Sequence, residues 1–103
     1  MRIAVASESK DENSRVYPVA GRAPYYLIFE NGVLVKTIKN PFAVGGGGAG
    51  FGVAQMLFNE NVDLVVSGNF GVNMIGALDE KGIKHVEVSD KVVSEVVKEF
   101  SKE

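Results

Sequence analysis

The second half of the chain changes its hydrophobic pattern several times. Residues 62–66 are apolar except for Asp63, and such a continuous run predicts a central strand that is covered on both faces. On either side of it, apolar residues recur at helical spacing over residues 51–59 and 72–78. Residues 83–88 predict another strand, and the apolar stripe from Val92 to Phe100 predicts a final helix, with Asp90 as its expected cap. The second half is therefore predicted to alternate helices and strands.

The first half predicts strands instead. Residues 3–6 form a short apolar run, and a polar loop is expected over residues 7–17. Residues 25–30 and 33–38 are rich in aromatic and β-branched residues, and Asn31-Gly32 lies between them. Asn-Gly favours a type I′ turn because both central positions of that turn need positive φ. The pattern predicts an antiparallel hairpin.

Together these elements have the order β-β-β-α-β-α-β-α. Strands that alternate with helices pair in parallel through right-handed crossovers, whereas the hairpin adds antiparallel strands to the same sheet. We predict a single α/β domain over residues 1–103, with a mixed five-stranded sheet flanked by helices in three layers. This is the arrangement of ribonuclease H-like folds.

Composition narrows the possible functions. The formal net charge of −2 and the scattered basic residues argue against binding to nucleic acid or to an anionic membrane surface. There is no cysteine, which excludes disulfides and clusters held by the protein's own thiolates. No segment approaches the length of a signal peptide or a transmembrane helix, so a cytoplasmic protein is expected.

The most informative segment is a glycine-rich loop between a predicted strand and a predicted helix. Its four consecutive glycines are candidate ligand-binding residues, because bare amides there could approach a ligand closely: Gly45, Gly46, Gly47 and Gly48. The spacing fits a dinucleotide fingerprint and the outer glycines of a Walker loop only loosely, since Phe51 follows where a Walker loop has lysine. A mobile connector without a ligand is the alternative interpretation.

Two further segments could bind an anion. The turn after the central strand opens a predicted helix with Asn69 as its expected cap, and its candidate binding residues are Ser67, Gly68, Asn69 and Gly71. Before the second strand stand Gly21 and Arg22, and a guanidinium offers a planar set of donors. His85 is the only histidine and is interpreted as an ordinary strand residue, so no metal ligands are predicted. No catalytic residues are predicted.

These segments carry a resemblance to a known family. Gly21-Arg22-Ala23-Pro24-Tyr25-Tyr26, the Asn40-Pro41 before the glycine-rich loop, the turn at residues 67–71 and the Leu78 to Ile83 ending resemble, in order, the dinitrogenase iron–molybdenum cofactor biosynthesis family. The resemblance implies a ribonuclease H-like fold. It also implies a protein, with a role accessory to nitrogen fixation, that carries nitrogenase cofactor, its precursor or a related metal–sulfur cluster.

One position departs from the family pattern. Family members usually have His-Phe immediately before Gly-Arg-Ala, whereas this chain has Val19-Ala20. The expected function is a non-enzymatic carrier of an anionic iron–sulfur or molybdenum–iron–sulfur cluster, with a protein partner in cluster delivery. The alternatives are a binding module for a small organic anion or a protein partner, a structural or interaction protein, and a hydrolase.

Overall fold

In the part of the chain that the structure describes, five strands form one mixed sheet in the order β3-β2-β1-β4-β5. The computed structural model describes residues 1–45 and 47–101. β1 pairs antiparallel with β2 and parallel with β4, while β2–β3 is antiparallel and β4–β5 is parallel. The strands are β1 (Arg2–Ser7), β2 (Tyr25–Glu30), β3 (Val33–Lys39), β4 (Leu64–Ser67) and β5 (Lys84–Glu87). The predicted element order and the mixed sheet are confirmed.

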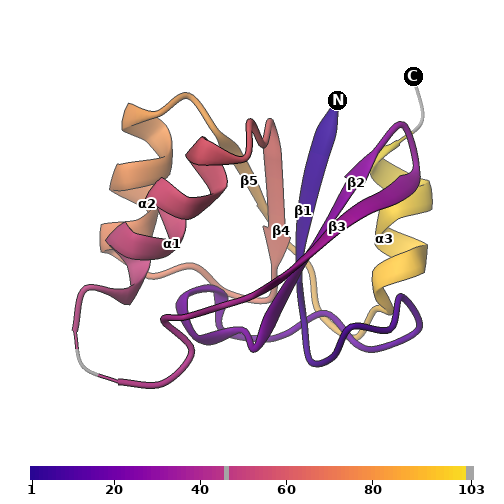
Figure 1. The fold of residues 1–103 in the computed structure, drawn as a ribbon, viewed down its shortest axis with the longest axis horizontal. Coiled ribbons are helices and arrows are strands. Elements are labelled where there is room, and N and C mark those ends of the chain that lie inside the picture. The colour runs from indigo at the N-terminus through magenta and orange to yellow at the C-terminus, as the bar shows by residue number, and fades with distance from the viewer. Residues whose placement is uncertain (46, 102–103) are drawn as a thin grey trace.

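Helices cover both faces of the sheet (Figure 1). They are α1 (Ala49–Asn59), α2 (Val72–Glu80) and α3 (Val93–Phe100), with a short 3₁₀ helix, η1 (Ala20–Arg22), before β2. α1 and α2 pack on one face, and α3 packs on the other (Figure 1). No helix among the described residues is long and apolar enough to cross a membrane.

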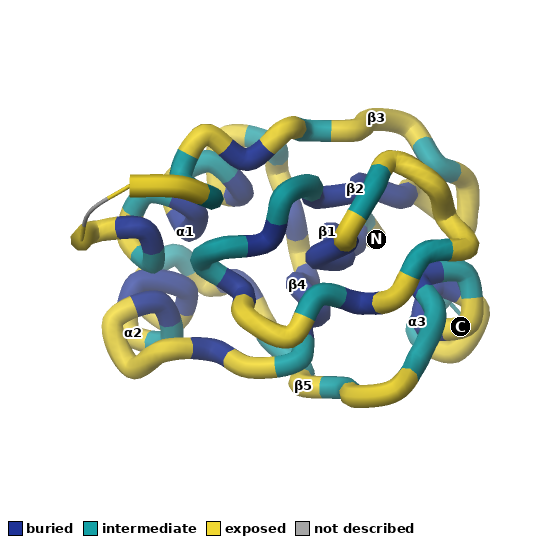
Figure 2. The backbone as a smooth tube through the Cα atoms, turned by 90° about the horizontal axis from the view of Figure 1, so that it is seen from below, coloured by how far each residue is buried: buried dark blue, intermediate teal, exposed yellow. Residues whose placement is uncertain are grey.

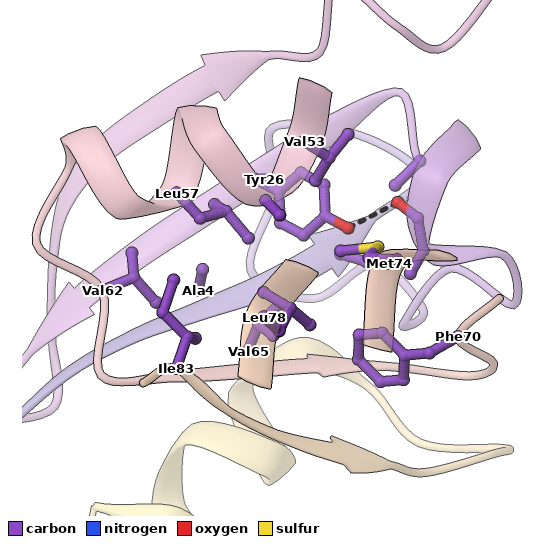
Figure 3. Packing of buried hydrophobic residues seen from close by; sticks show 14 of the residues in the cluster. Ala4, Tyr26, Val53, Leu57, Val62, Val65, Phe70, Met74, Leu78 and Ile83 are labelled. Carbon is purple, nitrogen blue, oxygen red and sulfur yellow. Dashed lines mark hydrogen bonds between the residues drawn. The ribbon is translucent and has the colours of Figure 1, made fainter. Parts of the chain in front are cut away.

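The strand side chains alternate between two hydrophobic clusters. On β4, Val65 belongs to the cluster under α1 and α2, whereas Leu64 and Val66 belong to the cluster under α3. A strand that is buried on both faces needs apolar residues at every position, which explains the continuous run. Figure 3 shows the first cluster, where the Tyr26 hydroxyl donates a hydrogen bond to the carbonyl oxygen of Ala20. Burial raises the pKa of the Tyr26 phenol.

Local turn chemistry confirms one prediction and corrects two. Asn31 and Gly32 both have positive φ, 51° and 82°, as the hairpin turn requires. Asn69 does not cap α2, because Gly71 occupies the N-cap position and makes no side-chain cap bond. Asp90 does not cap α3 either: it has a φ of 57°, and α3 begins after Val92, whose N–H donates to Glu95 Oε1 at 3.0 Å.

Candidate functional site

A loop crosses the carboxyl ends of β1 and β4 and organises this end of the sheet. We call residues 15–20 the strap. The Tyr17 N–H donates to the Ala6 carbonyl oxygen at 2.9 Å, which fixes the strap to the end of β1. The Ala20 N–H donates to the Asn69 carbonyl oxygen, also at 2.9 Å, which fixes its other end beyond β4. Figure 2 views this end of the molecule, with the buried strands β1 and β4 behind the loops.

The strap occupies the turn after β4. The carbonyl oxygen of Tyr17 accepts from the Gly68 N–H and from Ser67 Oγ, each at 2.9 Å. A Cβ atom added to Gly68 would lie 2.6 Å from the Cα of Pro18. Gly68 is therefore a glycine because another backbone approaches it closely, and its amide is used inside the protein.

Arg22 lies on the other side of the strap, close to the first turn of α1. A Cβ atom on the neighbouring Gly21 would be 3.5 Å from the Cβ of Ala49. Arg22 Nη1 donates to the Phe42 carbonyl oxygen at 2.9 Å. This bond ties the guanidinium to the segment that leads into the glycine-rich loop.

Asn40 shapes that segment. Its side-chain amide donates to the carbonyl oxygens of Gly21, at 3.2 Å, and Ala23, at 2.9 Å, and its Oδ1 accepts from the Phe42 N–H at 3.0 Å. Asn40 is only 4% exposed, and buried polar groups of this kind need such partners. One buried amide thus joins the Arg22 motif to the segment before the glycine-rich loop.

A pocket of about 600 Å³ opens beside Arg22, and we call it the Arg22 pocket. It is lined by Tyr17, Arg22, Pro24, Tyr25, Lys39, Asn40, Pro41, Ala43 and Val44. Arg22 and Lys39 are its charged lining residues, and no aspartate or glutamate is among those nine. A third cation stands nearby, since Lys10 Nζ lies 6.0 Å from the Tyr25 ring centroid. The lining combines positive charge with apolar and aromatic walls.

A smaller hollow of about 80 Å³ adjoins this pocket. It shares Arg22, Pro41 and Val44 with the Arg22 pocket and adds Phe42, Gly47 and Ala49. Ala49 is the first residue of α1, whose first-turn N–H groups have no partner within the helix. The hollow therefore brings a guanidinium, part of the glycine-rich loop and a helix N-terminus together.

The predicted site residues are thus divided between two places. Gly21, Arg22 and Gly47 lie on the side of the strap where the Arg22 pocket and the hollow are found. Gly48 lies there too, at the N-cap of α1, where its φ is 84°. Gly45 also has positive φ, 127°, and Gly46 lies outside the described residues. Gly71 is at the N-cap of α2, whose Met74 packs against Gly50 of α1.

Ser67, Gly68 and Asn69 belong to the opposite side of the strap. Ser67 is buried, and its hydroxyl is bonded to the strap. Gly68 and Asn69 line a second pocket of about 490 Å³, whose charged lining residues have both signs: Glu8, Arg15, Asp90 and Lys91. Tyr17 lines the Arg22 pocket and Pro18 lines the second pocket, so the strap separates the two.

Sequence reasoning missed the residues that complete the Arg22 pocket, above all Lys39. The register of β2 and β3 places Lys39 opposite Tyr25. A regular hairpin in which Glu30 pairs with Val33 would instead place Ile38 there, but the register shifts by one residue between Ile28 and Phe29. The bulge has no clear mark in the sequence. Among the described residues, no three or more histidine, cysteine, aspartate or glutamate side chains form a group that could hold a metal ion.

Comparison with known proteins agrees with this architecture. The model of the dinitrogenase iron-molybdenum cofactor family matches residues 1–103, and the chain belongs to that family. Its fold is similar to the apo form of the orange protein from Desulfovibrio gigas, with a TM-score of 0.89 and 26% identity over 96% of this chain and 85% of that one. It is also similar to a Thermotoga protein described as NifB-like and as a member of the DUF35 family, with a TM-score of 0.82 and 29% identity over 97% and 86% of the two chains. No protein with a curated description matches the chain in sequence.

Proposed function

We propose that this protein is a non-enzymatic carrier of an anionic metal–sulfur cluster, of the iron–sulfur or molybdenum–iron–sulfur type, or of a precursor of such a cluster. The cluster would be cargo, bound in the Arg22 pocket and released to an acceptor protein. Membership of a family named for the iron-molybdenum cofactor supports the class of cargo. The observation that carries the proposal is the charge of the pocket, whose lining has two cations and no carboxylate.

The donors of the pocket suit the outside of a cluster rather than its metal ions. Guanidinium and ammonium groups donate hydrogen bonds to anionic acceptors, and such charge-assisted bonds are stronger than neutral ones. Arg22 and Lys39 would therefore hold the sulfides that the cluster itself brings. Metal coordination by side chains is not part of the proposal, in keeping with the lack of a metal-binding group among the described residues.

The first turn of α1 would add main-chain donors. N–H groups at a helix N-terminus favour anions, both because they lack helical partners and because of the helix dipole. Ala49 and Gly47 line the hollow beside Arg22, which places this turn next to the guanidinium. Carriage requires binding and release only, so the proposal assigns no reaction to the protein.

Anaerobic titration with synthetic iron–sulfur and molybdenum–sulfur clusters tests the proposal, with the bound fraction read from the visible absorbance that elutes with the protein. Arg22→Ala and Lys39→Ala should each weaken binding about 10- to 100-fold, as expected for the loss of a hydrogen bond from a charged group. Arg22→Lys should recover part of the loss, because it keeps the charge and loses the planar fork.

The matched control is Lys98→Ala, because Lys98 is exposed on α3 on the far face of the sheet. Thermal melts verify that each variant is folded. Binding that is absent in the parent chain, or that falls equally in Lys98→Ala, would overturn the proposal.

A small organic anion is the second candidate, favoured by the apolar walls of the same pocket. Tyr17 and Tyr25 line it together with Pro24, Pro41 and Val44, and ligand sites commonly combine such walls with a few charged groups. A thermal-shift screen of aromatic and aliphatic carboxylates and phosphates separates the candidates. Stabilisation by one of these anions, with none from clusters, would select the second.

A further inference from the structure

The second pocket lies at the topological switch point of the sheet, on the side of the strap away from Arg22. β4 and β5 are parallel neighbours. The connection after β4 leads to α2 on one face of the sheet, and the connection after β5 leads to α3 on the other (Figure 1). Where the connections of two neighbouring parallel strands leave toward opposite faces, a crevice forms at the carboxyl ends of the strands, and open α/β sheets bind ligands in such crevices.

The lining of the second pocket coincides with this crevice. Gly68 and Asn69 directly follow β4, and residues 88–91 directly follow β5. The volume of about 490 Å³ is in the range of small-molecule sites. No described residue lines both this pocket and the Arg22 pocket, and the second pocket has no part in the proposed function.

Backbone hydrogen bonds hold the charged rim of the second pocket in place. The Glu8 N–H donates to the Arg15 carbonyl oxygen at 3.4 Å, which joins the loop after β1 to the strap. The Val16 N–H donates to the Lys91 carbonyl oxygen at 3.0 Å, which joins the strap to the connection after β5. The backbones that carry these charges are therefore fixed relative to one another without a ligand.

Three of the four charged side chains in this lining are open to a ligand. Lys91 Nζ is paired with Glu99 Oε1 at 3.0 Å. By contrast, the Glu8 and Asp90 carboxylates and the Arg15 guanidinium have no hydrogen bond or ion pair within the part of the chain that the structure describes, and all three residues are exposed. The pocket thus presents one cation and two anions that do not neutralise one another by direct contact.

We propose that the second pocket binds a free amino acid with an apolar side chain. A ligand with one ammonium and one carboxylate satisfies unpaired charges of both signs, whereas a simple anion would meet the two carboxylates and a simple cation would meet the guanidinium. The guanidinium suits the ligand carboxylate because its donors form a planar fork. Val16, Pro18 and Val88 add apolar surface to the lining, where the ligand side chain would lie.

Recognition in this pocket falls to side chains, because the neighbouring main chain is already used. The Gly68 N–H donates to the Tyr17 carbonyl oxygen and the Val88 N–H to the Ser67 carbonyl oxygen, each at 2.9 Å. Exposed charges contribute little and are screened by salt. We therefore expect a salt-dependent dissociation constant on the order of 1 mM.

A ¹⁵N–¹H chemical-shift titration with leucine tests the proposal. Saturable shifts should be largest for the amides of Asn69, Ser89 and Asp90, which belong to the lining of the pocket. The amides of Gly47 and Ala49, in the hollow beside Arg22, should stay nearly unchanged.

Variants of the charged lining should weaken leucine binding from both ends of the ligand. Arg15→Ala should raise the dissociation constant at least about tenfold, and so should the double variant Glu8→Gln/Asp90→Asn, because each removes charged hydrogen-bonding partners. Glu12→Gln is the matched control, since Glu12 is an exposed carboxylate of the same loop that does not line the pocket. Thermal melts verify that each variant is folded.

Two analogues of leucine separate recognition from a general loss of structure. Both should bind the parent chain at least about fivefold more weakly than leucine, because each lacks one charge. Leucinamide lacks the carboxylate, so Arg15→Ala should leave its binding unchanged within about twofold. N-acetylleucine lacks the ammonium, so Glu8→Gln/Asp90→Asn should not weaken its binding.

Four outcomes would overturn the proposal. They are the lack of a saturable shift with leucine, valine and phenylalanine, binding of both analogues as tight as that of leucine, binding that Arg15→Ala leaves intact, and shifts centred on the Arg22 pocket. An equal loss of binding in Glu12→Gln would count against it in the same way.

Discussion

Two glycine-rich segments, residues 45–48 and 67–71, each lead from a strand toward a helix at the same end of the sheet, yet they use their glycines differently. In the second segment, the Gly68 N–H and the Ser67 hydroxyl both bind the Tyr17 carbonyl oxygen. Pro18 lies so close that Gly68 has no room for a side chain. This segment is part of the frame of the protein.

The first segment borders the small hollow of about 80 Å³ that adjoins the Arg22 pocket. Gly47 lines the hollow beside Arg22, and a Cβ atom on Gly47 would meet no atom within 4 Å. We therefore expect glycines in a strand-to-helix connection to be available to a ligand only where the rest of the chain leaves their surroundings open. In this protein the strap makes the difference, because it covers the connection at residues 67–71 and does not cover the glycine-rich loop.

Adding one methyl group to each segment tests the difference between them. Gly68→Ala should reduce the free energy of unfolding by about 3 kcal/mol and the Tm by roughly 12 °C or more, since the strap backbone must move away from the new Cβ. Gly47→Ala should change stability by less than about 0.5 kcal/mol, because the new Cβ enters open space. Thermal and urea denaturation measure both variants, and equal effects would contradict the distinction between frame and open loop.

The next prediction concerns the hydrogen bond from the Tyr26 hydroxyl to Ala20, the first residue of η1. This short helix connects the strap to Arg22. Tyr26→Phe removes the donor to the Ala20 carbonyl oxygen and should cost about 2 kcal/mol, because a buried acceptor loses its partner. The pKa of Tyr26 is raised by burial, so the folded state keeps the neutral phenol. The contribution of the neutral Tyr26 phenol to the free energy of unfolding is fully present below the ordinary phenol pKa of about 10. It is lost as pH rises above that value.

The pH dependence provides the control within the same experiment. Urea denaturation from pH 8 to 11 should show the difference between parent and Tyr26→Phe shrinking above pH about 10. A difference that stays constant across this range would mean that Tyr26 is not held neutral by burial.

The smallest expected effect comes from a substitution in the strap, at Val19. Val19 stands where the resemblance described above implies a histidine, and it is 49% exposed at the N-cap of η1. Val19→His should leave stability within about 0.5 kcal/mol of the parent. It should strengthen cluster binding about fivefold, a gain of about 1 kcal/mol from one added hydrogen-bond donor. Val33→His, at an exposed position on β3, is the control, and an equal gain there would argue against a specific role for position 19.

Most of the fold could be predicted from the sequence because its periodicities are strong. The continuous run of β4, the Asn31-Gly32 turn and the stripe of α3 each have one simple structural solution. The failures concern caps. Asn69 and Asp90 are good cap residues by type, but each helix begins three residues after the predicted cap.

The candidate site was only partly predictable, because its composition depends on contacts between distant segments. Arg22 and the glycine-rich loop could be named from the sequence, and the hollow contains both Arg22 and Gly47. Lys39 could not be placed, since its position depends on a bulge in the hairpin. The use of the Gly68 amide could not be foreseen either, because its partner, Tyr17, lies 51 positions away in a loop without regular structure.

A ¹⁵N–¹H chemical-shift titration of the labelled protein with tetrathiomolybdate, a diamagnetic molybdenum–sulfur anion, tests directly whether the open glycine-rich loop and Arg22 bind such an anion. We expect saturable shifts that are largest for the amides of Val44, Gly47, Ala49 and Gly50 and for the Arg22 side chain, with the Gly68 amide nearly unchanged. Saturable shifts centred on residues 67–71, or no saturable shift in either segment, would contradict it.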